Sequence, residues 1–157
     1  MSELLEKLQL VNTYVGYFGI PVDVIGLARR LGIRVFDAPW PDNISGKIQR
    51  DEARGGESGF AIFVNEKHPE TRKRFTIAHE IAHYVLHEDQ IGDGVFDDAL
   101  YRSGLPEKIE AQANNLAADI LMPWSELKQH VGEPVDQLAE MFNVSTQAMA
   151  VRLGVFA

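Results

Sequence analysis

The chain has 157 residues, of which 45% are hydrophobic and 24% are charged, a length and composition typical of one globular domain. It contains no cysteine, which excludes disulfide bonds, thiolate metal sites and a cysteine nucleophile. The formal net charge of −8 opposes contact with phosphate backbones and anionic lipids, so we expect no direct binding to nucleic acid or membranes. The first residues lack the basic and apolar segments of a signal sequence, and we therefore expect a cytoplasmic protein.

The first half of the chain combines helical and extended patterns. Apolar spacing, together with Gly and Pro as interruptions, predicts two helices and then three extended segments, at residues 3–15, 21–31, 33–36, 44–50 and 59–65. A glycine-rich stretch at 51–58 joins the last two segments, which indicates an antiparallel hairpin.

The second half is predominantly helical. Residues 71–88 contain no Gly or Pro and are apolar over most of a helix circumference, which predicts a long, largely buried helix. Residues 89–105 contain three glycines, and we expect an irregular loop there. Beyond it the pattern predicts a helix over 106–122 and two short helices over 134–143 and 145–153.

The central helix contains the motif His79-Glu80-Ile81-Ala82-His83. At about 100° per residue, the two histidines lie roughly 40° apart on one face, and Glu80 lies on the same side. Both imidazoles can then bind one zinc ion while the glutamate reaches a water molecule beside it. Burying these polar groups in an apolar helix would cost several kcal/mol unless they were paired or bound a metal, so we expect a metal site.

A catalytic zinc usually has three protein ligands and an open position. His87 continues the histidine stripe, but three histidines at this spacing span about 12 Å and cannot share one ion, so we expect it in the core or supporting a ligand. Glu110 is the preferred third ligand, since small alanines on its helix face would allow close packing against the histidine helix. Glu107, one turn earlier, is its competitor. Asn114, one turn later, either supports a ligand or meets solvent.

Two runs of sequence, RFTIAHEIAHYVLH at 74–87 and EAQANNLAADILMP at 110–123, together resemble the ImmA/IrrE family of metallo-endopeptidases. The likeness extends more weakly to residues 22–35, to Ser45-Gly46, to 62–65 and to the C-terminal helices. Leu116 departs from the family, where an aromatic residue is common, and this is a change of packing.

The resemblance implies an α+β fold of the zincin type, close to the gluzincins, with a small antiparallel or mixed β-sheet and a buried HExxH helix. It also implies His79, His83 and Glu110 as ligands of one catalytic Zn²⁺ and Glu80 as the catalytic acid/base. We expect a single metallopeptidase domain over 1–157, composed of N-terminal helices (1–32), the sheet (33–66), the zinc-site helices (69–123) and C-terminal helices (124–157).

Members of this family typically act on a helix-turn-helix repressor in prophages, mobile elements and stress circuits. The resemblance therefore implies a protein partner, a repressor or an antitoxin, that is cleaved by zinc-assisted peptide hydrolysis. A regulatory or toxin-like protein that sequesters its partner without cleavage is the alternative.

Several other residues have open roles. Tyr101, in the expected loop, is either an oxyanion donor or a packing residue. The segment 59–64 is either an exposed edge that pairs with an extended substrate or an interior strand. His68 and His130 belong to no pattern, and we expect both at the surface.

The C-terminal residues 135–153 resemble a helix-turn-helix pattern, which could mark a DNA-binding module. Asp136 and Glu140 oppose the single cation of this stretch, Arg152, and few positive charges are available for phosphate. We therefore expect a helical packing unit or a surface that docks a protein.

Overall fold

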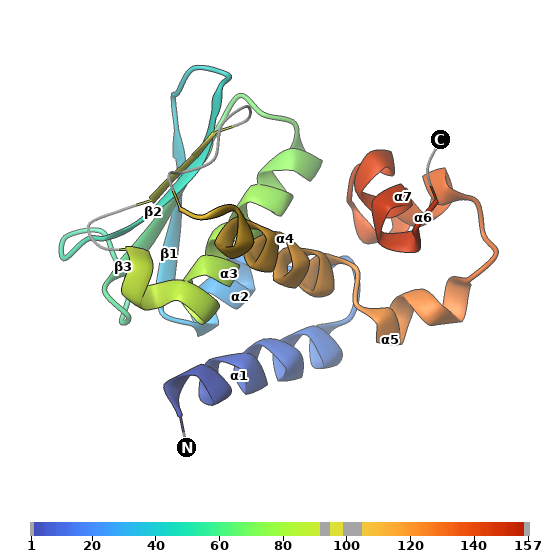
Figure 1. The fold of residues 1–157 in the computed structure, drawn as a ribbon, viewed down its shortest axis with the longest axis horizontal. Helices are drawn as coiled ribbons and strands as arrows, with labels where there is room; N and C mark the ends of the chain where they lie inside the picture. Colours follow the sequence, from blue (N-terminus) through green and yellow to red (C-terminus); the bar gives the residue numbers. More distant parts are fainter. Residues whose placement is uncertain (1, 92–94, 99–104, 156–157) are drawn as a thin grey trace.

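A four-stranded mixed β-sheet forms one side of the molecule (Figure 1). The computed structural model describes residues 2–91, 95–98 and 105–155. The strands are β1 (Ile33–Ala38), β2 (Ile44–Arg50), β3 (Phe60–Asn65) and β4 (Val95–Asp98), in the order β1-β3-β2-β4. Strand β3 is parallel to β1 and antiparallel to β2, which is itself antiparallel to β4. The predicted α+β class, the mixed sheet and the hairpin are therefore confirmed.

Strand β3 lies inside the sheet and is buried along its whole length. Its residues Phe60, Ile62 and Val64 join the main core, while Ala61 and Phe63 contribute to a smaller cluster on the other side. Because both edges of β3 are already paired, the expectation that residues 59–64 form a free edge for substrate is wrong, and the interior alternative is confirmed.

The expected irregular loop contains a strand. Residues 95–98 form β4 beside β2, and the preceding helix continues to Ile91, past the predicted end at residue 88. A strand of four residues is too short for a period-of-two pattern to show in the sequence, so the tertiary pairing with β2 determines this strand.

Two helices precede the sheet, α1 (Glu3–Phe18) and α2 (Val24–Arg30). Helix α1 is longer than predicted because Gly16 is accommodated within it instead of ending it. Lys7, on α1, is buried, and its ammonium donates to Glu88 Oε1 at 2.6 Å and to the Tyr84 carbonyl at 3.1 Å. These bonds attach α1 to the long central helix.

The central helix α3 (Glu70–Ile91) packs against the sheet, and α4 (Glu107–Leu121) packs across α3 (Figure 1). Two residues of α4, Ala113 and Ala117, are fully buried. Their small side chains allow the two helices to approach closely, as expected from the sequence. Helix α3 bends at His87, whose backbone angles are non-helical.

The C-terminal helices lie to one side of this core in Figure 1. A short helix α5 (Trp124–Leu127) and a 3₁₀ turn, neither of them predicted, lead to α6 (Val135–Phe142) and α7 (Thr146–Leu153). Asn143 adopts a left-handed conformation at the end of α6, and the Ser145 side chain caps α7, so the two predicted short helices are confirmed. No described helix has both the length and the apolar character that a membrane-spanning helix needs.

Candidate metal centre

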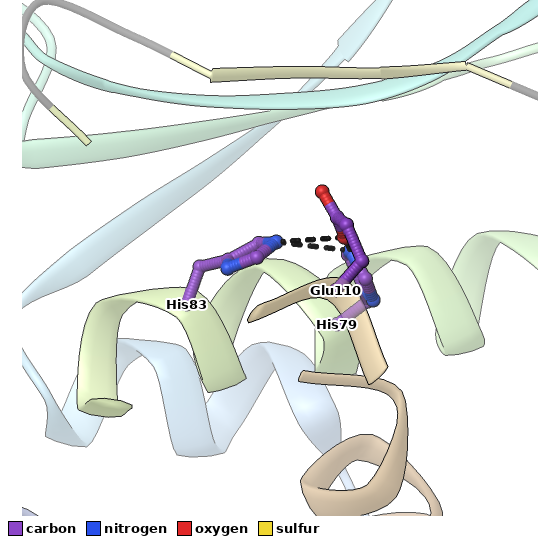
Figure 2. Close-up of side chains that lie close together, drawn as sticks. All are labelled: His79, His83 and Glu110. Atoms are coloured by element: carbon purple, nitrogen blue, oxygen red, sulfur yellow. Dashed lines mark hydrogen bonds and ion pairs between the residues drawn. The ribbon is translucent and has the colours of Figure 1, made fainter. Parts of the chain in front are cut away.

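Two histidines and a glutamate meet between α3 and the sheet. Figure 2 shows His79 and His83 rising from α3 toward the strands and meeting the carboxylate of Glu110, which comes from the start of α4. The exposed fractions of His79, His83 and Glu110 are 7%, 0% and 1%, so water is largely excluded from all three. Helix geometry alone places the two histidines one turn apart, whereas Glu110 arrives through the packing of α4 on α3.

The three polar atoms converge on one point. Nε2 of His79 and Nε2 of His83 lie 3.0 and 3.2 Å from the same oxygen, Glu110 Oε2, and 3.1 Å from each other. Ligand atoms about 2.0–2.1 Å from a tetrahedral zinc are about 3.3 Å apart, so these separations are close to one face of such a tetrahedron. The donor set of two imidazoles and a carboxylate can therefore hold a metal ion.

The two candidate glutamates differ in burial and in their neighbours. Glu110 is buried beside the histidines, whereas Glu107, one turn earlier on α4, is exposed. The two residues share a helix face, but Glu107 is the first residue of α4 and is exposed to solvent. Among the described residues, the cluster that could bind a metal contains Glu110 and not Glu107.

The outer nitrogens of both histidines have hydrogen-bond partners. His79 Nδ1 lies 2.8 Å from Asn114 Oδ1, and an amide oxygen can only accept, so this nitrogen donates and Nε2 keeps its lone pair for a metal. His83 Nδ1 lies 3.1 Å from Nδ1 of His87. Asn114 thus contacts a candidate ligand instead of facing only solvent, which fits the first of the two roles left open by the sequence.

His87 lies behind His83, on the side away from the converging atoms. It is buried, and desolvation lowers the pKa of its imidazole, which favours the neutral ring. It does not belong to the cluster of converging ligand atoms. The structure thus places His87 as the sequence predicts, in the core next to a ligand.

Glu80 lies under strand β2. It is fully buried, and β2 passes so close that a Cβ atom at Gly46 would collide with the Thr76 side chain and lie 3.8 Å from Glu80 Cγ. Only glycine allows this approach of strand to helix. Sequence reasoning assigned no role to Gly46, although the pair Ser45-Gly46 was part of the family resemblance.

Three further predictions have different outcomes. Tyr101 lies outside the described residues. His68 is buried, contrary to the expectation of a surface residue, because its Nε2 bonds to the Asp42 carbonyl at 2.9 Å within the loop before β2. His130 is half-buried and lies 2.7 Å from Glu133, away from the metal cluster.

One residue beside the site was missed entirely. Gln112, on α4, has its Oε1 2.8 Å from His87 Nε2. It lies off the face that carries Glu110 and Ala113, so helical periodicity gave no reason to select it.

Known proteins resemble this chain in sequence and in fold. Residues 28–154 match the model of the Peptidase_M78 family, described as the IrrE N-terminal-like domain. No curated protein matches the chain.

Among solved structures, a Mycobacterium tuberculosis transcriptional regulator is similar in fold, with a TM-score of 0.62 and 18% sequence identity. The match covers 99% of this chain and 48% of that one, so the present chain spans about half the length of the regulator. At this identity the similarity is one of fold alone. The family match covers most of the chain, including α3 and α4, and the protein therefore belongs to the IrrE N-terminal-like domain family of peptidases.

Proposed function

We propose that the protein is a zinc-dependent endopeptidase that hydrolyses a peptide bond in a specific protein substrate. The observation that carries the proposal is the convergence of His79 Nε2, His83 Nε2 and Glu110 Oε2 on one buried point, next in sequence and space to Glu80. On a charged surface helix both histidines would be exposed to solvent, whereas these two are buried and meet the carboxylate of Glu110.

The donor set favours zinc. Neutral imidazoles and a carboxylate in a tetrahedral array suit this ion, and three protein ligands leave one position for water or substrate. A zinc ion bound here would polarise the scissile carbonyl and lower the pKa of a water molecule toward about 7. Asn114 would hold the ring of His79 in the orientation that directs Nε2 to the ion.

Glu80 is the proposed acid/base. Its carboxylate takes the proton from the attacking water and later delivers it to the nitrogen of the leaving amine. Its complete burial beneath β2 shields the carboxylate from bulk solvent. Tyr101 stays a prediction as the donor to the developing oxyanion.

We propose a helix-turn-helix repressor, or an antitoxin of that kind, as the substrate, within a prophage, mobile-element or stress-response circuit. Support comes from the resemblance of residues 74–87 and 110–123 to the ImmA/IrrE family. The high negative charge of the chain also favours a protein partner over nucleic acid.

The test is incubation of the wild-type protein and of Glu80→Gln with any repressor that is encoded beside it, with the fragments identified by mass spectrometry. We expect cleavage by the wild type alone and binding by both, because the amide keeps the shape of the carboxylate and loses its basic lone pair. Equal binding without fragments from either protein would favour sequestration instead.

A DNA-binding role is the second candidate, since α6 and α7 have the order and lengths of a helix-turn-helix unit. The charges oppose it. Arg152 is the single cation of these helices. Its Nη1 lies 2.8 Å from Asp119 and its Nε donates to the Met122 carbonyl, so its guanidinium group already has partners within the protein. A sequence-specific shift of duplex DNA by the purified protein, equally strong for Glu80→Gln, would favour this candidate.

A further inference from the structure

A line of hydrogen bonds leads from the proposed metal ligand His83 to the surface of α4. His83 Nδ1 lies 3.1 Å from His87 Nδ1, and His87 Nε2 lies 2.8 Å from Gln112 Oε1. Both imidazoles are buried, with exposed fractions of 0% and 4%, whereas Gln112 is exposed. The line therefore begins at the metal cluster and ends at a residue that can be changed without disturbing the core.

The donor or acceptor role of each atom in this line determines the role of the next atom. The amide oxygen of Gln112 can only accept, so the proton of the neutral His87 ring resides on Nε2. His87 Nδ1 then has a lone pair and accepts from Nδ1–H of His83. A neutral His83 with its proton on Nδ1 has its lone pair on Nε2, the atom that faces His79 and Glu110.

We propose that Gln112 is a positioning residue that fixes the tautomer of His83 through His87, and thereby keeps the Nε2 lone pair of His83 directed at the metal. This inference rests on the proposed metal site and extends it to two residues that touch neither metal nor substrate.

The two ligand histidines are supported in different ways. Asn114 accepts directly from His79, one bond from the cluster, whereas Gln112 acts on His83 across an intervening ring. Two neutral imidazoles facing each other through Nδ1 fit only if one donates and the other accepts, so the group beyond the second ring decides the direction. Outer partners of this kind typically change metal affinity by about 10–100-fold.

The experiment is designed to exchange the donor and acceptor roles along this line of hydrogen bonds. Gln112→Glu keeps an acceptor next to His87 Nε2, whereas Gln112→Lys offers only donors there. With lysine at position 112, His87 Nε2 has to accept a hydrogen bond, so the proton of the His87 ring moves to Nδ1. His87 Nδ1 then donates to His83 Nδ1, and the proton of His83 has to lie on Nε2, the nitrogen that faces the metal. Ala111→Lys is the matched control, because it places the same charge on the neighbouring exposed residue of α4 without replacing the acceptor.

Two readouts are measured for each variant. The first is the zinc dissociation constant, obtained by chelator competition. We expect Gln112→Glu to bind at least as tightly as the wild type and Gln112→Lys to bind about 10–100-fold more weakly. Ala111→Lys should stay near the wild type.

The second readout is NMR of isotope-labelled histidine nitrogens in the metal-free protein, above the ordinary pKa of histidine. We expect Nδ1–H on His83 and Nε2–H on His87 in the wild type and in Gln112→Glu, and both reversed in Gln112→Lys. Unchanged tautomers in Gln112→Lys, or an equal loss of affinity in Ala111→Lys, would overturn the proposal. If the wild type bound no zinc, the proposed function would fail, and the NMR result would still decide whether Gln112 sets the tautomers.

Discussion

The central turns of helix α3 are buried on all sides, whereas the C-terminal helices α6 and α7 each bury one face, and the buried side chains differ in chemistry. In its central turns α3 buries His79, Glu80 and His83 among apolar residues, whereas the buried residues of α6 and α7 are all apolar. Burial of polar groups costs several kcal/mol unless they are partnered or bind a ligand. The polar interior of α3 therefore indicates a site, while packing alone explains the buried faces of α6 and α7.

The largest expected effect concerns the metal. His83→Ala and Glu110→Gln each remove one of the three converging atoms, so zinc affinity should fall by more than the roughly 100-fold typical of losing an outer hydrogen-bond partner. Glu107→Gln, on the exposed turn before, should bind zinc like the wild type. Elemental analysis of demetallated and reloaded protein checks this. Metal loss in Glu107→Gln with retention in Glu110→Gln would overturn the choice of third ligand.

In α6 we expect the opposite result, a loss of stability without a loss of zinc affinity. Phe142 is fully buried, and Phe142→Ala should lower the free energy of unfolding by about 3–5 kcal/mol through the cavity it leaves. The zinc affinity of the folded fraction should stay unchanged, because the cluster lies on α3 and α4. Denaturant unfolding and chelator competition on the same samples measure both quantities. A parallel loss of zinc affinity would contradict the distinction between the two regions.

The next effect is expected at Arg74, which connects α3 to the end of α6. Arg74, on α3, donates from Nη1 to the Val22 carbonyl at 2.8 Å and from Nε to the Asn143 carbonyl at 3.0 Å. One hydrogen bond to a charged group contributes about 1.5–3 kcal/mol, so Arg74→Met, which removes both bonds, should destabilise the protein by at least that amount. Arg72→Met, at an exposed position of the same helix, is the control and should have little effect in thermal unfolding.

The smallest effect is expected at Arg152. Its side chain packs over the Trp124 ring, donates to the Met122 carbonyl and pairs with the half-exposed carboxylate of Asp119. Of the interactions that Arg152→Gln removes, this ion pair should contribute about 1 kcal/mol or less. Neither the wild type nor this variant should bind duplex DNA measurably at physiological salt in an electrophoretic or anisotropy assay. DNA binding that Arg152→Gln removed would show that α7 contacts phosphate.

Local sequence patterns were sufficient to predict much of the candidate metal site. The spacing of His79 and His83 places both on one face of any helix that contains them, because α-helical geometry depends only on neighbouring residues. The same holds for the turn between α6 and α7 and for the hairpin of β2 and β3, whose signals are short-range.

The remaining features depend on contacts between distant elements. Helical spacing could reduce the third ligand to Glu107 or Glu110, but only the packing of α4 on α3 distinguishes the exposed residue from the buried one. The same packing brings Gln112 to His87, a contact that no periodicity in either helix predicts.

The sequence by itself determined the longer helices, the first three strands and the candidate metal ligands, because helix periodicity, turn residues and side-chain chemistry are local properties. The tertiary structure alone decided that β3 is interior, that β4 exists and that His68 is buried. Strand order and burial arise from contacts between segments far apart in the chain. Their stability depends on how whole faces fit together, and the spacing of residues within one segment does not contain that information.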